Sequence, residues 1–213
     1  MHAGFPCFTQ DIQQVMRLGA DDHAVSGLVD TIAGPALATG IALLLKLGFG
    51  YIMRDCLLDR ERTEKAIAFF DENFVFRDPN APNGQRFYQG KFLLRTRKAS
   101  DHMNVLLSFC PEPNEIFVDT PLGRSINSLK VVETEVIDEG KADALQRNPG
   151  KVDLVIRFKD VDSIVGLIGR DNVDIVGLLL ENVVQLTGNV GHLFKLGAIA
   201  KNIELELGLI KPS

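Results

Sequence analysis

The sequence predicts an α+β domain in which apolar helices lie over one face of a β-sheet. The main indication comes from the last third of the chain. A strand at 153–158 precedes two short helical patterns, a β-rich stretch ends at Gly188, and a final apolar helix opens at His192. The second indication is residues 74–109, where apolar and polar side chains alternate as in an antiparallel meander. A layer of apolar helices without recognisable catalytic residues is suited to holding an apolar molecule.

Within the meander, Phe74 and Phe76 alternate with their neighbours, and residues 79–84 form a dense turn signal of proline, asparagine and glycine. Further alternating stretches cover 87–97 and 103–109. Residues 110–150 are predicted to be an insertion that contains a β-prone stretch and a polar helix. The meander is therefore expected to have one apolar and one wetter face.

The N-terminal part is predicted to be a helical extension over 1–62, followed by the α+β domain over 63–213. Residues 31–53 carry a single charge, Lys46, and are long enough for a membrane span, which needs roughly 20 apolar residues. Pro35, several glycines and the cost of burying Lys46, about 2.5–3.5 kcal/mol, oppose a span. We expect a buried or interfacial helix. A spanning helix, or one exposed on ligand or partner binding, is the alternative.

An uncovered face of this helix, with Leu43–Leu45 and Phe49, is a candidate contact for a membrane surface, a partner enzyme or a second copy in a homodimer. The chain has 213 residues and a formal net charge of -5, which argues against nucleic-acid binding because no basic excess is available to displace counterions. A local basic cluster is predicted to be a solvated strand face, with contact to anionic lipid headgroups as the alternative. Its members are Lys91, Arg95, Arg97 and Lys98.

Cys7, Cys56 and Cys110 are odd in number and widely separated, so they indicate neither a disulfide framework nor a metal site. The first residues lack the basic segment of a signal peptide. We therefore expect a cytoplasmic protein, peripheral at the membrane if the helix within 31–53 docks there.

Residues 151–197 contain a strand, an acidic helix start, two apolar helices, a strand ending in glycine and a helix entry. These segments are 152–158, 160–162, 164–169, 172–180, 183–188 and 193–196. This succession resembles the sterol-carrier-protein (non-specific lipid-transfer) family. The meander resembles the first strands of that family more loosely, and the N-terminal helices are outside the resemblance. Family members usually carry a glycine and a lysine-rich strand after the second helix, where this chain has Leu180-Glu-Asn182 followed by two valines.

The resemblance implies a mostly antiparallel five-stranded sheet covered on one face by helices. It also implies a tunnel between sheet and helices for a fatty acyl chain, a sterol or an isoprenoid-quinone-type lipid. Apolar side chains of both layers are the candidate lining, although any one of them could equally be ordinary core. They are Phe74, Phe76, Phe92, Leu94, Leu107, Ile164, Leu167, Ile168, Ile175, Leu178, Leu179, Phe194 and Leu196.

No catalytic or metal-binding motif stands out. The four histidines have no ligand spacing to one another, and Asp160 and Asp162 are better explained as helix caps than as an acid–base pair. His192 is either a polar anchor at a pocket mouth or a helix-end histidine. We expect no cofactor and no metal.

The sequence therefore favours a non-catalytic protein that binds and carries or presents an apolar lipid. The alternative is a structural or assembly subunit that uses the same fold as a scaffold for a partner protein or a membrane-associated complex. A third hypothesis is an enzyme, and it requires that a partner or a cofactor supplies the chemistry. The two main readings differ in whether phenylalanines such as Phe74 and Phe92 fill the space between sheet and helices or line a tunnel.

Overall fold

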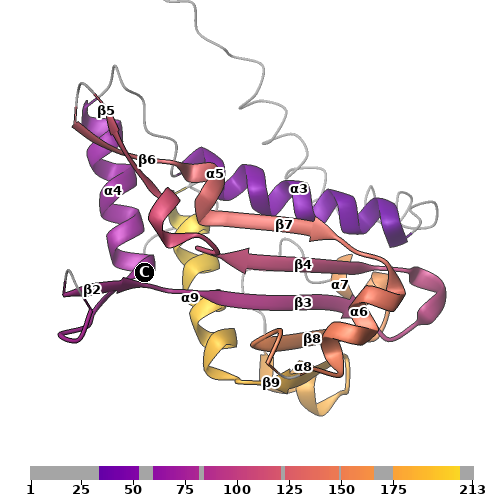
Figure 1. Cartoon of the computed structure of the whole chain (residues 1–213). Coiled ribbons are helices and arrows are strands. Elements are labelled where there is room, and N and C mark those ends of the chain that lie inside the picture. Colours follow the sequence, from indigo (N-terminus) through magenta and orange to yellow (C-terminus); the bar gives the residue numbers. More distant parts are fainter. Residues whose placement is uncertain are drawn as a thin grey trace, which may run out of the picture.

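The computed structural model has a five-stranded sheet at its centre, with strands in the order β7-β4-β3-β8-β9 (Figure 1). Strands β3 and β8 run parallel, and the other neighbours are antiparallel. The predicted α+β class and mostly antiparallel sheet are thus confirmed. The strands are β3 (Gly90–Thr96), β4 (Asn104–Phe109), β7 (Val132–Val136), β8 (Leu154–Phe158) and β9 (Val184–Gly188). The structure describes residues 34–52, 60–81, 84–120, 123–148, 150–165 and 175–206.

Alternation along the central strands gives the sheet two apolar faces. Phe92 and Leu94 of β3 pack on one face, whereas Leu93 packs with Leu106 and Val155 on the other. Successive side chains of a strand point to opposite faces, so the two groups belong to separate clusters. Because both groups are largely buried, both faces of the sheet are covered in this region.

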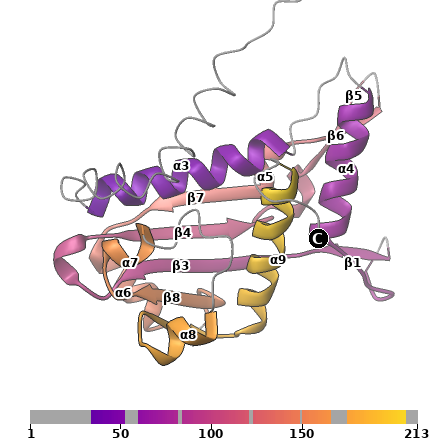
Figure 2. The same cartoon turned by 180° about the vertical axis from the view of Figure 1, so that it is seen from behind.

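Most helices cover the face that carries Phe92 (Figure 2). Helix α9 crosses this face and buries Ile199, and α3 lies along β7, where Thr134 Oγ1 donates a hydrogen bond to the Ala42 carbonyl at 3.0 Å. The helices on this side are α3 (Gly34–Ile52), α7 (Val161–Val165), α8 (Ile175–Leu180) and α9 (Gly191–Glu206). Helix α4 (Arg60–Phe74) stands at the end of the sheet and contributes its phenylalanines to the same core cluster.

Phenylalanine rings fill much of the space between this face and the helices. Phe74 at the end of α4 stacks on Phe70 with ring centroids 5.5 Å apart, and it lies 5.6 Å from Phe109 of β4. Phe109 in turn lies 5.7 Å from Phe92. Burying each ring contributes roughly 1.5–3 kcal/mol, so this cluster is a major source of stability.

The apolar stretch 31–53 forms α3 over residues 34–52, and its outer residues lie outside the described part of the chain. Ala38 and Ala42 are buried against Met103 and Val105, while Leu43 is 55% exposed. Small side chains on the inner side let α3 approach the sheet closely. No helix in the described ranges is long and apolar enough to cross a membrane.

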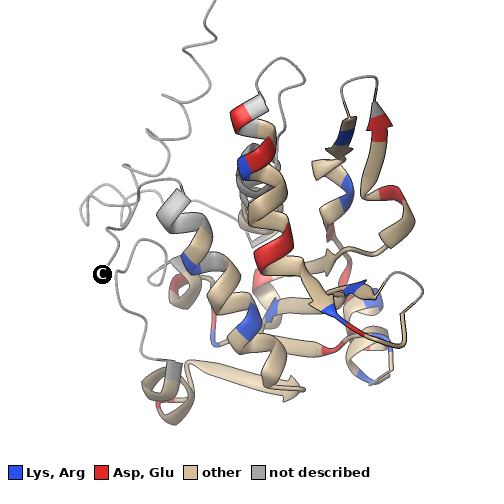
Figure 3. Cartoon of the chain, turned by 90° about the vertical axis from the view of Figure 1, so that its left-hand side faces the viewer, with Lys and Arg blue, Asp and Glu red and all other residues tan. Residues whose placement is uncertain are grey.

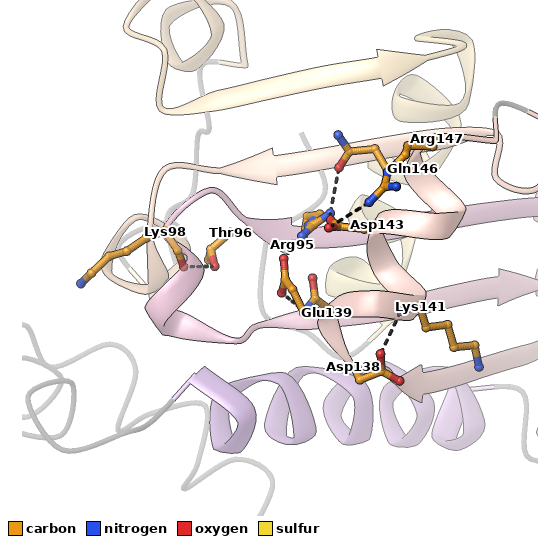
Figure 4. Close-up of polar contacts among 10 residues, drawn as sticks. Arg95, Thr96, Lys98, Asp138, Glu139, Lys141, Asp143, Gln146 and Arg147 are labelled. Carbon is orange, nitrogen blue, oxygen red and sulfur yellow. Dashed lines mark hydrogen bonds and ion pairs between the residues drawn. The ribbon is translucent and has the colours of Figure 1, made fainter.

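The second face carries α6 (Glu139–Gln146), which is held by Arg95 (Figure 4). The Arg95 guanidinium is buried and donates to Asp143 at 2.8 Å, to Gln146 at 2.9 Å and to Glu139. Arg95 was expected on a solvated strand face, but α6 covers it and supplies its acceptors. A buried guanidinium needs such partners because its desolvation is costly.

The remaining elements lie mainly towards one end of the sheet (Figure 1). They are β1 (Val75–Arg77), β2 (Gln85–Phe87), η2 (Pro113–Glu115), β5 (Phe117–Thr120), β6 (Gly123–Ile126) and α5 (Ser128–Val131), whereas η1 (Ala99–Asp101) connects β3 to β4 at the other end. Two details differ from the sequence-based expectation. Phe74 ends a helix rather than starting a strand, and segment 110–150 contributes β7 to the sheet and α6 to its second face.

Replacing Gly188 with alanine should destabilise the fold strongly. Gly188 has a φ of +119°, and an added Cβ would overlap the Asp153 carbonyl oxygen and lie 3.1 Å from Leu154 Cα. Gly123 has the same φ of +119° but no atom within 4 Å of such a Cβ, so it is the matched control. Urea unfolding should show that G123A lowers the free energy of unfolding by about 1–3 kcal/mol, because alanine is strained at this φ. G188A should lower it by ~2 kcal/mol more, because its Cβ also overlaps the Asp153 carbonyl. Equal losses would contradict the close approach of Gly188 to β8.

The Arg95 cluster should make stability depend on pH at the acid end. The hydrogen bond from Arg95 is the main cause that lowers the pKa of Asp143, with the Arg147 charge contributing less. A lowered folded-state pKa stabilises the fold at pH above the ordinary aspartate value of about 4, and this stabilisation is lost as pH falls through the folded-state pKa. NMR titration of the Asp143 carboxyl should show a clear upward pKa shift in R95M and a smaller one in R147Q. An unchanged pKa in R95M would contradict the network.

Candidate functional site

A half-open cavity of about 840 Å³ lies at the end of the sheet near β1 and β2. Its aromatic lining comes from Phe76, Phe87, Tyr88 and His192. Its polar lining consists of Gln85, Arg86, Gln89, Asn114 and Arg124, and Ala81 and Pro113 complete the wall. The cavity therefore combines aromatic surface with hydrogen-bond donors, as ligand sites commonly do.

The hairpin of β1 and β2 forms most of one wall. Its strands pair Phe76 with Arg86, and the connecting turn is closed by hydrogen bonds from Asp78 N to Gly84 O at 2.9 Å and from Ala81 N to Asp78 O at 3.0 Å. The turn signal at 79–84 predicted this reversal. The hairpin is short, so Gln85, Arg86 and Phe87 all reach the cavity wall.

Tyr88 and His192 meet at the inner side of the cavity. The Tyr88 hydroxyl lies 2.7 Å from His192 Nδ1, and the two ring centroids are 5.6 Å apart. Burial, and secondarily the negative charge of Asp153, raises the pKa of the Tyr88 phenol above its ordinary value. The phenol is therefore protonated at neutral pH, and it donates to Nδ1 when the neutral imidazole carries its proton on Nε2.

The start of α9 places His192 beside Tyr88. Asn189 caps the helix by accepting a hydrogen bond from Gly191 N at 2.9 Å, and Asn189 N donates to the Asp153 carbonyl at 3.0 Å. This contact ties the entry of α9 to the start of β8. His192 is the second residue of α9 and also lines the cavity, so its position agrees with both sequence-based hypotheses, the helix-end histidine and the polar anchor.

Both acidic and basic residues occur at this end of the molecule (Figure 3). Lys195, one turn after His192, places its Nζ 5.6 Å from the Phe76 ring centroid and 5.9 Å from that of Tyr88. Burial lowers the pKa of Lys195, with the Glu72 charge acting in the opposite direction. The ammonium group thus lies over the aromatic wall of the cavity.

Two ionisable groups at or beside the cavity are held in their neutral forms by burial. Burial raises the pKa of the neighbouring Cys110 thiol to about 12, which keeps it protonated and unreactive at neutral pH. Tyr88 is likewise held as the neutral phenol. Among the described residues there is no group of three or more His, Cys, Asp or Glu side chains that could hold a metal ion.

The structure places the predicted lining residues in several environments. Phe74, Phe92 and Leu107 are fully buried in the aromatic core, with Leu94, Leu178 and Leu196 partly buried against it. Ile164 packs under α3, and Leu179 and Phe194 are exposed, by 37% and 69% respectively. Leu167 and Ile168 lie outside the described residues, and of Ile175 only the backbone is described. Phe76 alone of the described set lines the cavity.

Sequence reasoning missed most of the cavity wall. Phe87 and Tyr88 follow the turn signal at 79–84, and two adjacent aromatic residues after a hairpin turn were a usable indication. Asn114 and Arg124 come from separate elements and carry no local signal that links them to the hairpin.

Comparisons with protein-family models, with curated proteins and with solved structures found no match for this chain.

Alkaline titration should reveal the raised pKa of Tyr88 in this chain, which has two tyrosines and no tryptophan. The raised pKa of Tyr88 stabilises the fold at pH below the ordinary tyrosine value of about 10, and the stabilisation is lost as pH rises through the folded-state pKa. The phenolate absorbance should therefore show a late step that Y88F removes and Y51F retains. Y88F should also cost about 1 kcal/mol through the lost hydrogen bond to His192. A single step near the ordinary value would contradict the buried Tyr88–His192 pair.

Proposed function

We propose that this protein binds and carries or presents an apolar, lipid-like small molecule without transforming it. The observation that carries the proposal is the half-open cavity of about 840 Å³ with its aromatic wall. Ligand pockets typically enclose about 300–1,000 Å³ and are lined by apolar and aromatic groups with a few polar contacts. The cavity has this size and this mixture of groups.

Apolar burial supplies the affinity in such a site. Each methylene transferred from water contributes about 0.8 kcal/mol, so a short alkyl chain against the aromatic wall already gives measurable binding. Phe76 and Tyr88 lie with their ring centroids 6.1 Å apart in an edge-to-face arrangement. This arrangement presents both apolar ring surface and the polar edge of the Tyr88–His192 pair to a ligand.

The resemblance to the sterol-carrier-protein family supports the same class of ligand. The observed five-stranded sheet and the succession β8, α7, α8, β9 and α9 agree with what that resemblance implies. The cavity lies at the hairpin end of the sheet rather than among the predicted lining residues of α7 and α8. We therefore place the ligand beside Tyr88 and His192.

A scaffold or assembly subunit is the second candidate. Phe74 and Phe92 fill the space between sheet and helices, which is the arrangement expected if that layer serves stability alone. Phe194 of α9 and Leu43 of α3 are exposed and offer contacts to a partner protein, a second copy or a membrane surface. Ligand content decides between the two functions.

Native mass spectrometry of the purified protein, followed by organic extraction, tests the proposal. A stoichiometric co-purified lipid, or saturable uptake of a fluorescent fatty acid, is the expected result. A protein that carries no lipid and takes up none of the probe would contradict it and favour the scaffold.

Filling the cavity should reduce uptake. Ala81 lies in the hairpin turn at the cavity wall, so the indole of A81W should occupy space that the ligand needs. Each methylene kept out of the cavity costs about 0.8 kcal/mol of binding, so displacing two or more should weaken probe binding at least about tenfold. Ala144 is exposed on α6 of the opposite face, and A144W is the matched control that should bind like the unmodified protein. Circular dichroism checks that both variants fold. Equal binding by A81W and the parent would place the ligand elsewhere.

A further inference from the structure

Among the described residues of the cavity wall, both charged side chains are basic. Arg86 of β2 and Arg124 of β6 line it together with the carboxamides of Gln85, Gln89 and Asn114. No aspartate or glutamate is among the described residues of the wall. A site of this composition attracts negative charge even though the chain as a whole is acidic, with a net charge of -5.

Arg124 lies against an aromatic ring, and Asp119 is its cross-strand partner in the β5–β6 pair. Its guanidinium carbon lies 3.6 Å from the ring centroid of Phe117, and within the described ranges it forms no ion pair. The acids at the two ends of the η2 turn pair with another base, because Lys130 contacts Glu112, which precedes η2, at 3.0 Å and Glu115 at 2.7 Å. Stacking on the ring leaves the in-plane N–H donors of the guanidinium directed outward.

Arg86 is also available to a ligand. Its Nε lies 3.7 Å from Asp78 Oδ2, which is beyond hydrogen-bonding distance, and its side chain is 69% exposed. Asp78 Oδ1 accepts a hydrogen bond from Asn80 N at 3.0 Å, which holds this carboxylate to the turn. Screening by solvent weakens an ion pair of this geometry, so an anion in the cavity can compete with it.

We propose that the ligand is an anionic amphiphile whose carboxylate or phosphate group is bound by Arg86 and Arg124, with its apolar part against Phe76, Phe87 and Tyr88. This inference rests on the proposed function, since it specifies the headgroup of the same ligand. Guanidinium groups bind carboxylate and phosphate oxygens through paired, charge-assisted hydrogen bonds. The carboxamides of Gln85 and Asn114 can donate further hydrogen bonds to the same group.

Isothermal titration calorimetry with matched probes tests the headgroup. The probes are decanoate, decyl phosphate, decanol and inorganic phosphate, each titrated into the full chain at neutral pH. Decanoate and decyl phosphate should bind at least about tenfold more tightly than decanol, because charge-assisted hydrogen bonds exceed neutral ones. Inorganic phosphate should bind far more weakly than decyl phosphate, because it lacks the alkyl chain.

Removing either arginine should affect the anions selectively. R124Q and R86Q should each weaken the binding of decanoate and of decyl phosphate by roughly tenfold and leave the affinity for decanol unchanged. R124K keeps the charge but not the planar guanidinium, so it should retain part of the preference for the anions. The matched control is R147Q, which removes an arginine that is 79% exposed, directly after α6 on the second face of the sheet, and should change none of the affinities.

The outcomes distinguish this inference from the function on which it rests. Equal affinities for decanoate and decanol, unaltered in R124Q and R86Q, would overturn the anion site while leaving a lipid-binding cavity. Failure of every alkyl probe to bind would contradict the proposed function itself. Inorganic phosphate binding as tightly as decyl phosphate would overturn the amphiphile and identify a free anion as the ligand.

Discussion

The parallel pairing of β3 with β8 is the contact on which the rest of the structure depends. It joins strands β3, β4 and β7 to the antiparallel β8–β9 pair, and Asp153 secures it at one end. Lys91 N donates to the Asp153 carboxylate and Asp153 N donates to the Lys91 carbonyl, both at 2.8 Å. The Asp153 carbonyl then accepts a hydrogen bond from the backbone N–H of Asn189, two residues before α9. The same residue therefore sets the sheet register, the position of His192 and part of the electrostatic environment of Tyr88.

The distribution of aromatic side chains separates stability from binding. Rings from α4, β3 and β4 contact one another in the layer between sheet and helices and are completely buried. Towards the end of the sheet, Tyr88 continues this series, lying 6.0 Å from Phe109, but it also faces the cavity. A packed layer thus supports a site at its margin, and the rigid core can position Tyr88 and His192 without itself opening for a ligand.

The fold class and the order of elements from β8 to α9 could be predicted because alternation and helical periodicity are local properties of the sequence. The place of β7 could not, since its pairing with β4 depends on contacts that no local pattern specifies. Arg95 is a second example. The alternation of charged and apolar residues along its strand indicates a polar face, and only the position of α6 shows that Arg95 is buried. The cavity wall brings together Arg86, Asn114, Arg124 and His192 from separate elements, so its composition emerges only in three dimensions. His192 was recognisable as a candidate because it precedes an apolar helix.

The most direct test of the central claim is to locate a bound amphiphile on the folded chain. Paramagnetic broadening of backbone amide signals by a spin-labelled fatty acid measures proximity without altering any residue. The account predicts saturable broadening at residues 85–89 and 191–194, which a diamagnetic fatty acid competes away. Broadening confined to α3 or to the second face around α6, with the hairpin and the start of α9 unaffected, would contradict it.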